Sequence, residues 1–151
     1  VIVHPTRRYW FRNCDQGNGV QQAETCKIGR MILGLDDLKP ETGLRLVPRL
    51  PDDFSSMEAQ AYPVVTEKAG ALGQTPVDYR YQRTEKGYRL SLKASQPLLV
   101  DTLRFGPFPE ETPGFAPCGE ETEVRSIQGR KFVYVKLGRP VENLEITVEC
   151  C

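Results

Sequence analysis

Hydrophobic residues between positions 20 and 35 recur at steps of three and four. The set is Val20, Ala23, Ile28, Met31, Ile32 and Leu35. This spacing predicts one amphipathic helix with a single apolar stripe. Asn18 is a suitable N-cap residue, and Gly34 with Pro40 beyond it is typical of a helix end. We therefore expect a helix over residues 19–37, preceded by a leader loop over residues 1–18.

From residue 44 the hydrophobic period changes to two, which indicates β-strands. Residues 77–94 predict a hairpin with a turn at Lys86 and Gly87. In this hairpin the apolar positions of one strand face those of the other, Val77, Tyr79 and Tyr81 against Tyr88, Leu90 and Leu92. Gln128 and Gly129 predict a second hairpin turn.

Other short runs rich in β-branched and aromatic residues have the same character. They are "LRLVPRL", "MEAQAYPVV", "PLLVDTLRFG", "ETEVRSI", "KFVYVKL" and "VENLEITVEC". Residues 106–121, with four prolines and three glycines, predict a long ordered loop or a crossover. The predicted fold class is mainly β, an antiparallel β-sandwich over residues 38–151 with one N-terminal amphipathic helix.

Composition is that of an ordinary globular protein. Of 151 residues, 39% are hydrophobic and 26% are charged, and 20 basic side chains balance 20 acidic ones. A net charge of zero gives no general electrostatic reason to bind nucleic acid or an anionic membrane. No apolar run approaches the roughly 18 residues of a membrane span. We expect neither partner, and we expect the chain to be a segment of a longer polypeptide.

Side chains for catalysis or metal binding are sparse. A Ser-His or Cys-His hydrolase needs a histidine base, and the single histidine is His4. Adjacent carboxylates beside Pro or Gly are expected to be solvated turn residues. They are Asp36 and Asp37, Asp52 and Asp53, Glu110 and Glu111, and Glu120 and Glu121. We predict no catalytic residue.

Five cysteines, at positions 14, 26, 118, 150 and 151, show no CxxC spacing. Neither a metal nor a cofactor is therefore expected. Cys14 could pair with Cys26, and Cys118 with Cys150 or Cys151. Reduced, mostly buried thiols are the alternative that we expect.

The leader "HPTRRYWFRNCDQGNG" combines groups suited to sugar binding. An aromatic ring covers the apolar side of a sugar, and planar polar groups bind its hydroxyls. The candidate substrate-binding residues are Arg8, Trp10, Arg12, Asp15 and Gln16. The alternative is a leader whose aromatic residues only pack on the helix or on other parts of the longer protein.

Two phrases carry a resemblance to a known family. Residues 32–37, "ILGLDD", and 46–54, "LVPRLPDDF", resemble the junction near the C-terminus of (α/α)6-barrel glycoside hydrolases and disaccharide phosphorylases, with Phe54 where tryptophan is usual. In that group the last barrel helix is followed by a β-sandwich. The resemblance implies a non-catalytic C-terminal accessory domain whose partners are the catalytic barrel of the same polypeptide and carbohydrate.

This reading predicts an exposed apolar surface along the helix and leader. The rival hypothesis is an independent carbohydrate-binding or cell-surface recognition module. It predicts aromatic residues grouped on one sheet face or loop cluster, with Tyr62, Tyr79, Tyr81, Tyr88, Phe105 and Phe108 as candidates. Most of these alternate with polar residues, a pattern that favours the core.

Overall fold

The computed structural model describes residues 2–3, 10–11 and 27–151. The chain divides into two units, Val1–Ile32 and Leu33–Cys151. In the first unit, β1 (Ile2–Val3) pairs antiparallel with β2 (Trp10–Phe11). Residues 27–33 are helical.

The helix ends at Leu33, so the prediction that it reaches position 37 is wrong. Gly34 has a φ of 71° in the left-handed region, and its carbonyl accepts a hydrogen bond from the Val47 N–H at 2.7 Å. A β-carbon at Gly34 would overlap the Val47 carbonyl oxygen. The glycine thus ends the helix as expected. Leu35, predicted to lie on the helix stripe, is buried instead in a strand.

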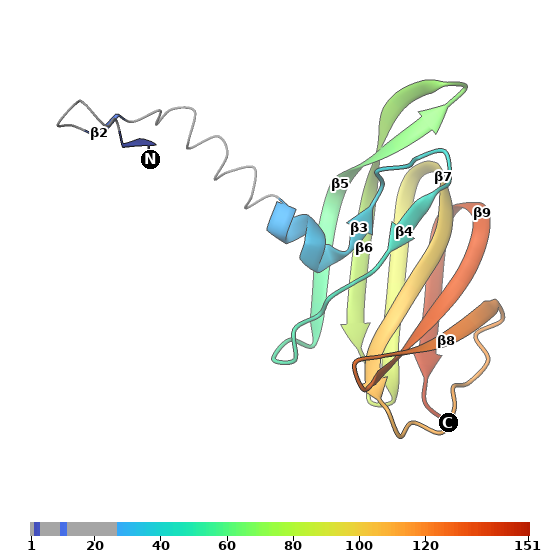
Figure 1. Cartoon of the computed structure of the whole chain (residues 1–151). Coiled ribbons are helices and arrows are strands. Elements are labelled where there is room, and N and C mark those ends of the chain that lie inside the picture. Colours follow the sequence, from blue (N-terminus) through green and yellow to red (C-terminus); the bar gives the residue numbers. More distant parts are fainter. Residues whose placement is uncertain (1, 4–9, 12–26) are drawn as a thin grey trace. The chain divides into compact units, whose positions relative to one another are not determined.

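The second unit is built on one seven-stranded sheet (Figure 1). Its strands are β3 (Leu35–Asp36), β4 (Leu44–Leu46), β5 (Ser56–Lys68), β6 (Ala71–Arg83), β7 (Gly87–Pro109), β8 (Glu121–Ile127) and β9 (Arg130–Glu149). The order is β3-β4-β7-β6-β5, and β9 pairs with both β7 and β8. The prediction of a mainly β fold with one short helix is confirmed for the described residues.

The sheet departs from a simple antiparallel sandwich in two ways. First, β4 runs parallel to β7, with Leu44 opposite Val100, so the sheet is mixed. Second, β7 and β9 serve both halves of the sheet. The start of β7 lies between β6 and β9, and its later part lies between β4 and β9. The result is partly barrel-like.

Bulges explain why short strands that the sequence predicts separately are joined in the long strands β7 and β9. The β7–β9 register shifts between Lys93 and Leu98, where Pro97 cannot donate a hydrogen bond, and shifts again between Val100 and Thr102. A bulge bends a strand without ending its ladder. The runs on either side of residues 95–97 therefore belong to β7, and the two C-terminal runs form β9.

Both predicted hairpins form. In the first hairpin the pairing is shifted by two residues from the predicted one. Tyr81 lies opposite Leu90, Tyr79 opposite Leu92 and Val77 opposite Ala94. Tyr88 pairs with Arg83 instead of Tyr81. In the turn between β8 and β9, Gln128 and Gly129 have φ values of 52° and 70°. The loop predicted over 106–121 is shorter, because residues 106–109 continue β7, including the cis bond between Gly106 and Pro107.

Aromatic side chains fill one end of the core. Tyr81 stacks on Tyr88 with ring centroids 5.3 Å apart, and Phe108 meets the Tyr88 ring edge-on at 5.2 Å. The Tyr81 hydroxyl accepts the Gly106 N–H at 3.1 Å and lies 3.4 Å from the carbonyl oxygen of the same residue. The Tyr79 hydroxyl is also buried, but it has no hydrogen-bond partner within the described ranges. Of these two tyrosines of β6, the hydroxyl of Tyr81 is thus hydrogen-bonded and that of Tyr79 has no partner among the described residues.

Burial changes the acidity of these tyrosines. Loss of hydration raises the pKa of Tyr79 and Tyr81 well above the ordinary 10.0, and it raises the pKa of Tyr88 as well. For Tyr81 the Gly106 hydrogen bond acts in the opposite direction but is the smaller effect.

The two tyrosines should respond oppositely to loss of the hydroxyl. Tyr81→Phe leaves the buried Gly106 N–H without its partner, so we expect it to destabilise the protein by about 1–3 kcal/mol. Tyr79→Phe removes a buried hydroxyl that lacks a described partner, so its stability should equal or exceed that of the parent chain. Urea unfolding of the two matched variants measures both. Equal losses would contradict the assignment.

Stability should also fall in alkali. Above the unfolded-state tyrosine pKa of about 10, the unfolded chain releases phenol protons that the folded chain retains, so folding stability present below that pH is lost as pH rises. Two fully buried tyrosines give a slope of about 2.7 kcal/mol per pH unit. Thermal unfolding across this range measures it, and the phenolate absorbance of the buried tyrosines should appear together with unfolding. Tyr79→Phe should roughly halve the slope, and an unchanged slope would contradict this origin.

Candidate functional site

The predicted sugar-binding residues lie almost entirely outside the described residues. This holds for Arg8, Arg12, Asp15 and Gln16. Trp10 is described through its backbone, which pairs with Val3. Their role as substrate-binding residues stays a prediction.

The helical residues 27–33 present apolar side chains to solvent. Ile28 is 57% exposed, Met31 59% and Ile32 39%. Spacings of three and four residues place these side chains on one face of a helix. Leu33, in the second unit, is partly buried against the core. The stripe predicted from the sequence is therefore apolar and uncovered in its described part.

One predicted solvated carboxylate is structural instead. Asp37 is 2% exposed, and its Oδ2 accepts a hydrogen bond from the Val65 N–H at 2.6 Å. The expectation of a solvated turn residue is wrong for Asp37, because this bond joins the segment after β3 to β5. Four others are exposed turn residues as predicted, namely Asp52, Asp53, Glu110 and Glu111. Glu120 instead pairs with Arg139 at 2.7 Å.

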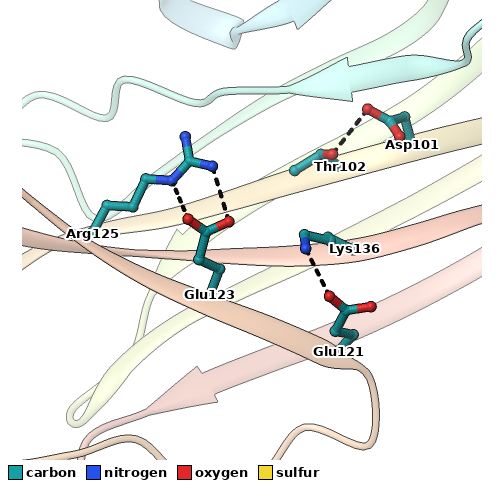
Figure 2. A network of polar contacts seen from close by, with 6 residues as sticks. All are labelled: Asp101, Thr102, Glu121, Glu123, Arg125 and Lys136. Carbon is teal, nitrogen blue, oxygen red and sulfur yellow. Dashed lines mark hydrogen bonds and ion pairs between the residues drawn. The ribbon is translucent and has the colours of Figure 1, made fainter.

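A charged network covers the outer side of β8 and β9 (Figure 2). Arg125 binds Glu123 through two hydrogen bonds of 2.7 and 2.9 Å, and Lys136 contacts Glu121 at 2.7 Å. The bond from Arg125 lowers the pKa of Glu123, and the bond to Glu121 raises the pKa of Lys136. The first pair lies within β8, and the second joins β8 to β9. As exposed pairs they contribute little to stability.

Two arginines cover the aromatic rings of the same face. The Arg104 guanidinium lies 4.8 Å from the centre of the Phe132 ring, and that of Arg125 lies 4.6 Å from the Tyr134 ring. Arg104 also donates to the Pro48 carbonyl at 3.1 Å, and burial lowers its pKa. The two aromatic rings are thus engaged by the protein's own cations rather than left free for a ligand.

A different polar surface lies on β5, β6, β7 and the C-terminal part of β9. Here a groove of about 510 Å³ crosses the sheet. Its polar side chains come from strand positions that alternate with the buried core, and they include Asp78, Arg80 and Lys93. Sequence reasoning missed this groove. The alternation marked these residues as solvent-facing, but no pattern along the chain showed that four strands would bring them together.

A second hollow, of about 590 Å³, lies where the β6–β7 turn meets the C-terminal residues, beside Tyr88 and Phe108. Cys150 and Cys151 line it, and both are free thiols, as is Cys118. For these three cysteines the structure has the expected reduced thiols and not the pairing of Cys118 with Cys150 or Cys151, although Cys151 is exposed. Cys14 and Cys26 lie outside the described residues.

Two further features are absent from the described ranges. There, no group of three or more His, Cys, Asp or Glu side chains is arranged to hold a metal ion. Within the same residues, no helix has both the length and the apolar character that crossing a membrane requires.

Comparisons with known proteins add no relative. No protein-family model matches the chain. Neither a curated protein nor a solved structure matches it.

Proposed function

We propose that this chain is a non-catalytic accessory domain of a larger carbohydrate-active enzyme, and that the helix docks on the catalytic domain of the same polypeptide. The observation that supports the proposal most is the exposed stripe of Ile28, Met31 and Ile32. A helix in water normally turns such a stripe toward a core.

The proposed occupant of this stripe is a helical catalytic domain. The resemblance of segment 19–37 to the last helix of an (α/α)6 barrel suggests it, since such a helix packs against other helices. Gly34 supports the same geometry, because it ends the helix and directs the chain into β3 within one residue. The β-rich unit would then hold the end of that helix through Leu35, which is 4% exposed.

The rival hypothesis of an aromatic recognition surface has less support. Five of its six candidate residues are buried: Tyr79, Tyr81, Tyr88, Phe105 and Phe108. The sixth, Tyr62, packs partly buried against the core. They therefore cannot offer ring faces to a sugar.

Substitution of the stripe tests docking. The first protein is the longer polypeptide, read from the reading frame upstream of Val1. In it, the triple variant Ile28→Ser, Met31→Ser and Ile32→Ser should lose roughly 1–2 kcal/mol of stability for each side chain. The reason is that each side chain would lose apolar contact with the catalytic domain. In the 151-residue chain alone the same variant should change stability by only about 0.5 kcal/mol. Thermal unfolding of both proteins makes the comparison.

A matched control uses apolar side chains of the second unit. Leu72 and Val124 are 73% and 48% exposed, so Leu72→Ser and Val124→Ser should leave both proteins unchanged. Equal effects of the triple variant in the long and short proteins would contradict docking. So would an upstream reading frame that encodes no helical domain.

The leader allows a separate test of sugar binding. In the longer enzyme, Trp10→Ala and Arg8→Ala should each raise KM or lower kcat by about tenfold, because a stacked ring or a charge-assisted hydrogen bond to substrate is lost. Trp10→Phe keeps an aromatic face and should retain most activity. Steady-state kinetics decide the question, and unchanged kcat and KM in both alanine variants would remove the leader from the sugar site.

A further inference from the structure

The groove on β5, β6, β7 and β9 has a floor of two polar rows that cross the strands. In the first row, Glu58 lies opposite Arg80, Arg80 opposite Ser91, and Ser91 opposite Glu145. In the second row, Asp78 lies opposite Lys93, and Lys93 opposite Asn143. Neighbouring strands are about 4.8 Å apart, so a ligand lying across them meets a polar side chain at each strand.

Most of these side chains are not used by the fold. Within the described part of the chain, five of them make no hydrogen bond or ion pair, namely Glu58, Arg80, Ser91, Lys93 and Asn143. Glu145 has one long contact, 3.7 Å to Arg89. The network of Figure 2 is the opposite case, because its charges bind one another. The groove therefore keeps its donors and acceptors available.

One wall of the groove is shaped by a bulge in β5. The β5–β6 register shifts between Ala59 and Tyr62, and Ala61 has a φ of 49°. The Ala61 N–H donates to the Asp78 Oδ1 at 2.9 Å, which fixes this carboxylate at the edge of the groove. A smaller hollow of about 150 Å³ continues beyond it and shares Asp78 and Lys93. Bulges of this kind often lie beside binding sites.

The mixture of groups limits the ligand. The carboxylates of Glu58, Asp78 and Glu145 stand among the cations of Arg80 and Lys93, so neither a polyanion nor a polycation meets a favourable field. Among the described residues that line the groove, the aromatic side chain is that of Tyr79, which is 2% exposed. Binding there would depend on hydrogen bonds rather than on ring stacking.

We propose that this groove binds a neutral, hydroxyl-rich chain, an oligosaccharide lying across β5, β6, β7 and β9. Each sugar hydroxyl both donates and accepts, and the two rows offer donors and acceptors side by side. The volume of about 510 Å³ lies within the range of ordinary ligand sites. An extended peptide fits less well, since three of the apolar side chains that line the groove, Tyr79, Leu92 and Leu144, are buried and offer little surface to its side chains. This site does not depend on docking of the helix.

The test uses the 151-residue chain on an array of neutral and acidic oligosaccharides, followed by NMR titration of the isotope-labelled protein with the best neutral binder. We expect binding to a neutral glycan and shifts of the amide signals of Arg80, Ser91, Lys93 and Asn143. Silence of every neutral glycan overturns the proposal. Binding of acidic glycans alone, or shifts confined to other residues, overturns it as well.

Paired variants separate a specific site from general surface charge. Arg80→Ala with Lys93→Ala should weaken binding by about tenfold or more, because charge-assisted hydrogen bonds are lost. Lys136→Ala with Arg139→Ala removes the same charge from β9 outside the groove and should change affinity by less than about twofold. Circular dichroism checks folding of both. Equal weakening by the two pairs overturns the proposal. The triple variant Ile28→Ser, Met31→Ser and Ile32→Ser should bind the glycan as the unchanged chain does, whether or not the helix docks.

Discussion

The ladder between β7 and β9 is the interaction on which the second unit depends. It runs from Gly87 opposite Glu149 to Pro109 opposite Arg130, with register shifts that bend both strands. Because of these bends, one pair of strands carries β6 at one end and β4 at the other. Core residues from both halves, such as Leu90 and Val135, therefore belong to a single cluster. Without this ladder, neither β6 at one end of the sheet nor β4 at the other would have a paired β7–β9 ribbon beside it.

The β-rich unit carries two polar surfaces of different character. Around β8 the charges are paired: Glu123 holds Arg125, and Glu121 holds Lys136. Across β5, β6, β7 and the end of β9, side chains such as Arg80 and Lys93 face a hollow without binding one another. Paired charges close a surface to hydrogen-bonding ligands, whereas unpaired donors and acceptors in a concavity are open to them. This difference, rather than total charge, distinguishes the proposed ligand groove from the rest of the surface.

The exposed apolar side chains of helical residues 27–33 are separate from the core of the β-rich unit. Ile28 and Met31 are exposed and are not among the described core residues, of which Leu35 is the first fully buried one. The proposed docking and the proposed glycan groove involve separate residues, one set before Gly34 and the other on the sheet. An accessory domain that holds a catalytic domain at one surface and a carbohydrate chain at another would combine both, and each part stands on its own evidence.

Local patterns in the sequence determined much of the β-rich unit. The hairpin of β6 and β7, the turn at Gln128 and Gly129 and the helix end at Gly34 each depend on a few neighbouring residues. The parallel pairing of β4 with β7, the burial of Asp37 and the groove arose only in the tertiary structure. They join residues far apart in the chain, so no single segment encodes them.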